Sequence, residues 1–227
     1  MTDNQLTIDF APEPSLSRAD FVLGSCNALA ADWIDRWPDW PGRIRGLVIH
    51  GPPDCGKSHL GAIWSEASKA RLFTSVDAEA VADIGPDSHV LLDHPRPGAD
   101  WPEDILFHLL NRLAGGEGSV LVLSRQPMPN LGWQLADLSS RLGGLVAAAI
   151  TTPDDDVLIA VMQKHADDLG LALDGEIARY ILQRIERSFT AARHAVSQIN
   201  AVAMRRKKKV SLALVRDILD QIQPRLF

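Results

Sequence analysis

Residues 51–58 contain the stretch that decides the fold, Gly51-Pro52-Pro53-Asp54-Cys55-Gly56-Lys57-Ser58. It matches the pattern G-x-x-x-x-G-K-[ST], whose glycines let the backbone turn so that several N–H groups face one anion. Apolar residues before it predict a buried strand, and the residues from Lys57 onward predict a helix. A loop between a strand and a helix N-terminus forms a phosphate cradle. The sequence therefore predicts a nucleotide site in which Lys57 reaches the terminal phosphates and Ser58 holds Mg²⁺.

Short apolar strands alternate with amphipathic helices around this loop, which indicates an α/β fold with a parallel sheet. From Pro153 onward the apolar spacing is helical throughout. We expect a flexible tail at 1–18, an αβα nucleotide-binding domain at 19–152 and a small all-helical domain at 153–227. The strands expected are Leu47–His50, Arg71–Val76, His89–Asp93, Ser119–Ser124 and Leu145–Ile150. The helices expected are Ala28–Trp37, Lys57–Ala70, Asp104–Ala114, Leu135–Leu142, Asp154–Leu169, Asp174–Arg184, Thr190–Arg205 and Leu212–Gln223, with Thr152, Asp174 and Ser211 as helix N-caps.

Composition narrows the class of protein. The chain has 227 residues, a net charge of −6 and 46% hydrophobic residues, enough for a sizeable core. Its two cysteines offer no disulfide framework, so a reduced, cytoplasmic compartment is expected. No signal peptide or membrane-spanning run is apparent. The acidic total argues against strong direct binding to DNA through charge alone.

A carboxylate ends the apolar strand Val90–Asp93. In a protein with such a phosphate loop, this Asp93 is expected to order Mg²⁺. His94 follows where many hydrolysing proteins of this type have a second acidic residue, so weak intrinsic hydrolysis is expected. Whether His94 acts in the site or only faces solvent stays open. Ser124-Arg125-Gln126 follows another strand and either senses the γ-phosphate or is ordinary strand-end polarity.

Three further clusters have competing interpretations. The basic run Arg205–Lys209 fits a solvated turn better than a contact with nucleic acid or an acidic partner, given the acidic total. Trp33, Trp37 and Trp40 fit packing of a helix better than a platform for bases. Asp154–Asp156 fits negative charge at a helix N-terminus better than a metal cluster.

The N-terminal segment Gln5–Phe10 places apolar residues at alternate positions. In an extended chain these side chains lie on one face, where they fill a partner's apolar pocket. The other interpretation is an edge strand on the domain itself. The residues concerned are Gln5, Leu6, Ile8 and Phe10.

Together these motifs resemble the DnaA/Hda group of AAA+ ATPases, and most closely its Hda-type regulatory inactivators. Asp20–Asn27 resembles the segment that lies beside the nucleotide base, and Leu138–Leu142 matches the box that carries the family's arginine finger, here Arg141. Gln5–Phe10 is similar to the family's peptide for the bacterial sliding clamp, and the C-terminal helices resemble its lid. The implied nucleotide-binding residues are Phe21, Val22, Asn27, Pro53, Asp54, Cys55, Gly56, Lys57, Ser58, His59 and Arg193.

The resemblance implies a function and leaves choices open. It implies a protein that holds ADP or ATP with Mg²⁺, binds the β subunit clamp of DNA polymerase III and presents Arg141 to ATP on the initiator DnaA, so that replication does not re-initiate. Thr190 falls where the family has an arginine in its lid, and either Arg187 or Arg193 is the substitute. The alternatives are a DNA-remodelling or helicase-loading ATPase and a clamp-bound adaptor without finger activity. A homodimer is also left open.

Overall fold

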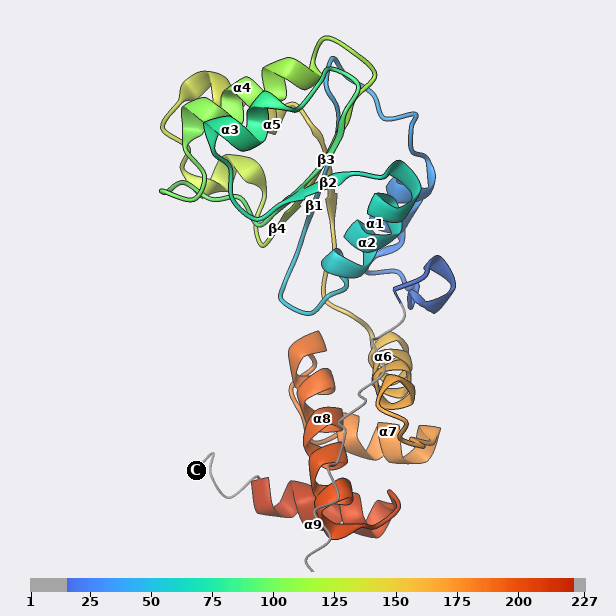
Figure 1. The fold of residues 1–227 in the computed structure, drawn as a ribbon. Coiled ribbons are helices and arrows are strands. Elements are labelled where there is room, and N and C mark those ends of the chain that lie inside the picture. The colour runs from blue at the N-terminus through green and yellow to red at the C-terminus, as the bar shows by residue number, and fades with distance from the viewer. Residues whose placement is uncertain (1–15, 223–227) are drawn as a thin grey trace, which may run out of the picture. The chain divides into compact units, whose positions relative to one another are not determined.

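The structure is a computed structural model that describes residues 16–222 (Figure 1). The chain divides into two compact units, of which the first is Leu16–Asp154. The described part of the second unit runs from 155 to 222. In that described part of the chain, no helix combines the length and the apolar character needed to cross a membrane.

Within residues 16–222, five strands form one parallel sheet in the order β2-β3-β4-β1-β5. The α/β class is therefore confirmed. The two outer strands are shorter than expected, because β2 ends at Phe73 and β5 covers only four residues. The strands are β1 (Arg45–His50), β2 (Arg71–Phe73), β3 (His89–Asp93), β4 (Ser119–Ser124) and β5 (Val146–Ala149).

The sheet is buried on both sides, which explains its near-continuous apolar strands. Every residue of β4 is buried, and the middle of β1 is too. Helices α1 (Ala28–Asp35) and α2 (Lys57–Ser68) lie on one side of the sheet in Figure 1. On the other side lie α3 (Ala78–Ala82), α4 (Glu103–Leu113) and α5 (Ala136–Gly143).

Helix α3 was not expected from the sequence. It has five residues, too few to show a helical period, and it begins where the Asp77 carboxylate accepts a hydrogen bond from the Ala80 N–H. Two short 3₁₀ turns, η1 (Arg18–Asp20) and η2 (Met128–Leu131), also lie in this unit.

Two of the three tryptophans near the first helix pack on other rings, as the packing interpretation predicts, whereas Trp33 is half-buried with Arg36 over its ring. The Trp40 ring stacks on Trp64 of α2 with centroids 5.4 Å apart, and its Nε1 donates to the Trp33 carbonyl. Trp37 meets the His89 ring edge to face at 5.2 Å. These rings pack against one another, so they do not form a platform for bases.

The second unit consists of helices joined by capped turns. Asp174 accepts from the Ile177 N–H and Ser211 from the Leu214 N–H, so two predicted N-caps are confirmed. The prediction of Thr152 as an N-cap was wrong, because the first helix begins at Asp155. Ser188 is an N-cap that the sequence analysis missed. The helices are α6 (Asp155–Asp168), α7 (Gly175–Leu182), α8 (Phe189–Arg206) and α9 (Leu212–Ile222).

One prediction concerns His89 at the start of β3. Burial, with help from the nearby Arg45 charge, lowers its pKa below the ordinary 6.5. The unfolded chain therefore takes up this proton first, and the free energy of unfolding falls as pH drops from about 6.5 toward the folded-state pKa. Phe at this position keeps the ring contacts and removes the buried Nδ1, which has no hydrogen-bond partner in the described structure.

His89→Phe should therefore be at least as stable as the wild type at pH 7. It should also lose less stability between pH 7 and pH 5 in urea denaturation. An unchanged pH dependence would show that His89 titrates alike in the folded and unfolded chain.

Candidate functional site

The Gly51–Ser58 loop leaves the carboxyl end of β1, inside the sheet. The Gly51 N–H donates to the Ser124 carbonyl at the end of β4, and the Ile150 N–H donates to the His50 carbonyl. The loop is thus held from the strands on both sides of β1. In open parallel sheets, ligands bind outside the carboxyl ends of the strands.

Gly56 fixes the turn from this loop into α2. Its φ of 94° lies in the left-handed region, and a Cβ there would come within 3.0 Å of the Phe21 ring. Gly56 is also the N-cap of α2 and brings no capping side chain. The first N–H groups of α2 are therefore left for an anion, as the phosphate-cradle prediction requires.

Lys57 lies beneath the loop and is only 4% exposed. Its Nζ donates to the Gly51 carbonyl at 3.0 Å and to the Pro52 carbonyl at 2.6 Å. It also donates to the Cys55 Sγ at 3.6 Å. In the described residues it forms no ion pair, so only uncharged groups hold this buried ammonium. Such a cation favours an anionic ligand over water.

The neighbours of Lys57 are kept neutral. Burial, and secondly the Lys57 charge, lower the pKa of His50, which ends β1. Burial raises the pKa of the Cys55 thiol even though Lys57 opposes the shift. These shifts favour an uncharged imidazole at His50 and an uncharged thiol at Cys55, so no thiolate competes with phosphate for Lys57.

The segment Phe21–Asn27 is fixed beside the loop. The Asn27 amide accepts from the Gly24 N–H and donates to the Val22 carbonyl, each at 2.9 Å. The Phe21 ring meets His59 of α2 edge to face at 5.3 Å, and His59 Nε2 lies 2.8 Å from the Ser17 carbonyl. The predicted residues Phe21, Val22, Asn27 and His59 therefore meet at the start of α2.

Asp93 and His94 form a pair at the end of β3. His94 Nδ1 lies 2.6 Å from Asp93 Oδ1, and the His94 backbone has a φ of 55°. The His94 ring is thus turned back onto the carboxylate, and its side chain remains 38% exposed. No cluster of three or more metal-ligating side chains occurs among residues 16–222.

The donor set nevertheless fits Mg²⁺ that arrives with a nucleotide. Mg²⁺ usually takes one or two protein oxygens and keeps waters or phosphates as its other ligands. The Ser58 hydroxyl is exposed at the start of α2, and the Asp93 side chain is 36% exposed. These two residues are the ones that would hold it.

Arg141 stands on α5, which is anchored by the buried Leu138 and Leu142. Its guanidinium lies over the ring of Phe107 from α4, 4.9 Å from the ring centroid. It forms no ion pair with any of residues 16–222. Phe107 was not expected from the sequence, because it lies 34 positions away and only the fold brings the two together.

The two candidate lid arginines differ in their surroundings. Arg187 Nε donates to Asp155 at 2.9 Å, in an exposed ion pair at the start of α6. Arg187 precedes the N-cap of α8, so it is not on that helix as expected, whereas Arg193 lies in α8 about one turn after Thr190. Arg193 is exposed and has no ion pair within the described range. Asp155 and Asp156 stand in the first turn of α6, as the helix-terminus interpretation of this acidic run predicts.

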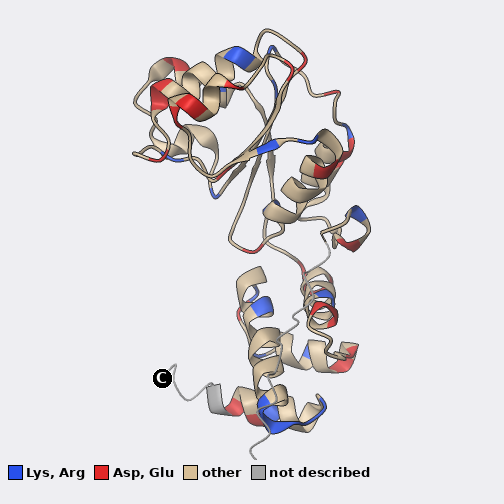
Figure 2. Cartoon of the chain, viewed as in Figure 1, with Lys and Arg blue, Asp and Glu red and all other residues tan. Residues whose placement is uncertain are grey.

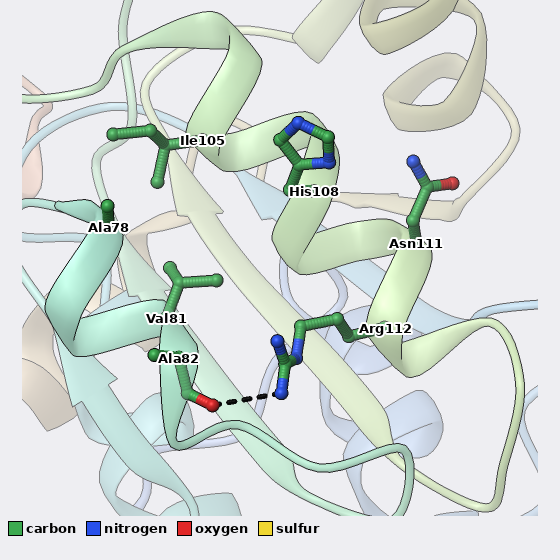
Figure 3. Close-up of a pocket in the computed structure, with 7 residues that line it drawn as sticks. All are labelled: Ala78, Val81, Ala82, Ile105, His108, Asn111 and Arg112. Carbon is green, nitrogen blue, oxygen red and sulfur yellow. Dashed lines mark hydrogen bonds between the residues drawn. The ribbon is translucent and has the colours of Figure 1, made fainter.

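The predicted clamp-binding segment and a pocket in the first unit lie apart from the phosphate loop in the sequence. The residues Gln5, Leu6, Ile8 and Phe10 lie outside the described range. A pocket between α3 and α4 involves no residue predicted for the site (Figure 3). In it Arg112 reaches across to the Ala82 carbonyl at 2.9 Å. Its lining is Ala78, Val81, Ala82, Ile105, His108, Asn111 and Arg112.

Parts of this sequence are similar to known proteins. Residues 154–219 match the family described as Hda, lid domain. The chain is 26% identical over 244 residues to the chromosomal replication initiator protein DnaA of Thermomicrobium roseum, covering 95% of this chain and 52% of that protein. It thus spans about half the length of that relative.

Solved structures show the same fold. Domain III of the Thermotoga maritima replication initiation protein DnaA superposes with a TM-score of 0.73 at 18% identity, over 92% of this chain and 97% of that chain. The structure of the replication initiator DnaA bound to AMPPCP and single-stranded DNA superposes with a TM-score of 0.64 at 18% identity. The match covers 88% of this chain and 70% of that chain. The fold is therefore that of DnaA domain III, with an α/β unit followed in the chain by a helical unit.

Gly56 provides a prediction with a matched control. Gly132 also has a positive φ, 75°, but a Cβ there would meet nothing within 4 Å. Gly132→Ala should cost only the backbone strain, ~1 kcal/mol. Gly56→Ala adds the contact with Phe21 and should cost about 1–3 kcal/mol more in urea denaturation. Equal costs would mean that Phe21 moves aside freely and does not fix the turn.

Proposed function

We propose that this chain is a DnaA/Hda-type AAA+ protein, a nucleotide-binding regulator of replication initiation that acts on a partner's ATP. In this proposal it docks on the DNA-loaded sliding clamp and stimulates ATP hydrolysis by the initiator DnaA. Re-initiation is thereby prevented. The observation that carries the proposal is Arg141, held over Phe107 without an acidic partner among the described residues.

The chain's own nucleotide, ADP or ATP, binds at the Gly51–Ser58 loop. The left-handed Gly56, the open N-terminus of α2 and the buried Lys57 ammonium support this step. Mg²⁺, held by Ser58 and Asp93, offsets the phosphate charge. The solved structure of DnaA bound to AMPPCP, which has the same fold, agrees with a nucleotide ligand.

Hydrolysis on the chain itself is slow in this proposal. The Asp93 carboxylate is followed by His94, whose ring is occupied by that same carboxylate. A water attacking the γ-phosphate then lacks the acidic group that many related ATPases provide. The bound nucleotide serves as a structural ligand.

Arg141 acts in trans. Phosphoryl transfer spreads negative charge over the equatorial oxygens, and a guanidinium placed there lowers the barrier. Stacking on Phe107 fixes the side chain while leaving its N–H donors for a phosphate, because the ring contacts the guanidinium face. An arginine already bound to a carboxylate would first have to break that pair.

Two other functions are separable from this one. A DNA-remodelling ATPase needs rapid intrinsic turnover, which the Asp93–His94 pair disfavours. A clamp-bound adaptor would need neither Lys57 nor Arg141, so the variants below distinguish it. A homodimer is compatible with either regulator or adaptor.

Nucleotide binding is tested by Lys57→Met, which keeps the buried aliphatic stem and removes the ammonium. Affinity for ADP and ATP should fall by about 1.5–3 kcal/mol, the range for hydrogen bonds to charged groups. Titration calorimetry measures this, and a thermal melt establishes that the variant is folded. Folded protein with unchanged affinity would remove the phosphate-cradle assignment.

Clamp binding is tested at the N-terminal segment. Changing Gln5, Leu6 and Phe10 to Ala should abolish binding to immobilised clamp and leave the melting temperature unchanged, because a few anchor side chains dominate such contacts. Ala at Thr2, Asp3 and Asn4 is the matched control and should bind. Retained binding by the first variant would refute the segment's role.

The trans mechanism is tested by Arg141→Ala. The variant should fold, bind nucleotide and bind clamp, yet lose the stimulation of DnaA, which for arginine fingers is worth ~10³–10⁵ in rate. Arg141→Lys should not restore it, since a point charge lacks the planar fork. Steady-state phosphate release by DnaA measures both. Full stimulation by the Ala variant would favour the adaptor.

A further inference from the structure

The end of α8 carries a run of cations that the proposed function does not use. We call Arg205–Lys209 the basic turn. Lys207 has a left-handed φ of 49°, and the N–H groups of Lys207 and Lys208 donate to the carbonyls of Met204 and Ala203, respectively. The turn is thus closed by backbone hydrogen bonds, and all its side chains are exposed.

Interactions within the lid account for only part of this charge. Arg205 and Arg206 lie in the last helical turn, where cations interact favourably with the helix dipole. Arg206 also pairs with Asp217 of α9. Lys207, Lys208 and Lys209 lie beyond the helix end and form no ion pair within residues 16–222. Three adjacent like charges therefore remain without compensation in the described structure.

The charge of the chain is unevenly distributed. Residues 16–154 contain 11 Lys and Arg against 17 Asp and Glu, whereas residues 155–222 contain 11 against 9. Nearly half of the cations in the second range fall in the basic turn, where the blue segments gather at the α8–α9 connection in Figure 2. Although the net charge of the chain is negative, the basic turn forms one compact positive surface.

We propose that the basic turn binds the phosphate backbone of duplex DNA. Duplex DNA presents one negative charge per ~1.7 Å of its axis, a density that suits consecutive lysines. Backbone phosphates carry no sequence information, so the contact is independent of sequence.

Single-stranded DNA fits this surface less well. Its binding relies on aromatic rings that stack on bases, and residues 203–220 contain no aromatic residue. The ring of Tyr180 in α7 has Arg184 at 3.5 Å and Arg216 at 5.7 Å from its centroid. Its faces are therefore occupied by cations.

The contact between the basic turn and DNA is weak by itself, and it strengthens binding when another contact already holds the chain beside DNA. A second site on a tethered molecule gains from a high effective concentration, so a few phosphate contacts suffice once the chain is held beside DNA. The proposal does not depend on which partner holds it there, and it can be tested with the chain alone.

The test measures anisotropy of a labelled 30-base-pair duplex of arbitrary sequence with the full chain between 50 and 200 mM salt. Three to five phosphate contacts predict a log–log slope of about −3 to −4.5, or ~10²-fold weaker binding across that range. Changing Lys207, Lys208 and Lys209 to Gln should make the slope shallower by about 2.7. A control that changes Arg43, Lys69 and Arg179 to Gln alters the net charge equally and should retain the wild-type slope.

Two results would overturn the proposal. One is no duplex binding by the wild type at 50 mM salt, including the case in which it binds vesicles of anionic lipid instead. The other is an equal loss of duplex affinity and of salt dependence in both triple variants. That result would mean that the overall charge of the chain, and not the basic turn, is responsible for binding. Thermal melts of both variants establish that each comparison is made on folded protein.

Discussion

The hydrogen bonds from the buried Lys57 ammonium to the Gly51 and Pro52 carbonyls are the interaction on which the candidate site depends. A buried charge without a carboxylate partner is costly, and the loop makes it tolerable by turning its own oxygens inward. The same turn directs the opening N–H groups of α2 outward. The left-handed Gly56 allows that geometry, with Phe21 packed where a Cβ would stand. The loop, α2 and the Phe21–Asn27 segment therefore form one coupled arrangement.

The sequence predicted the parts of this arrangement that are local. The loop, the buried strand β4 with its apolar centre Val120–Leu123, and the caps Asp174 and Ser211 each depend on neighbouring residues, and each is found where expected. Contacts between distant residues could not be predicted in this way. Phe107 under Arg141 and the fold of His94 onto Asp93 follow from tertiary packing and backbone conformation. The short α3 was missed because five residues do not show a period.

The electrostatics of the chain suit a regulator more than an independent enzyme. The phosphate loop concentrates one cation among neutral neighbours, which favours holding a nucleotide. The position after Asp93, where an acidic group would assist hydrolysis, holds His94, whose ring contacts the Asp93 carboxylate. Arg141, by contrast, lies over an aromatic ring and has no acidic partner in residues 16–222. In the proposed function, different residues therefore bind the nucleotide and assist catalysis, and the assisting residue acts on another protein's nucleotide.

The most direct measurement is single-turnover hydrolysis of ATP already bound to purified DnaA, with wild-type chain and DNA-loaded clamp added together. A single turnover excludes nucleotide exchange, so the rate reports the chemistry on DnaA alone. The account predicts that hydrolysis accelerates by ~10³-fold or more, as for other arginine fingers supplied in trans, and only when both components are present. An unchanged rate, with clamp binding and nucleotide binding intact, would contradict it.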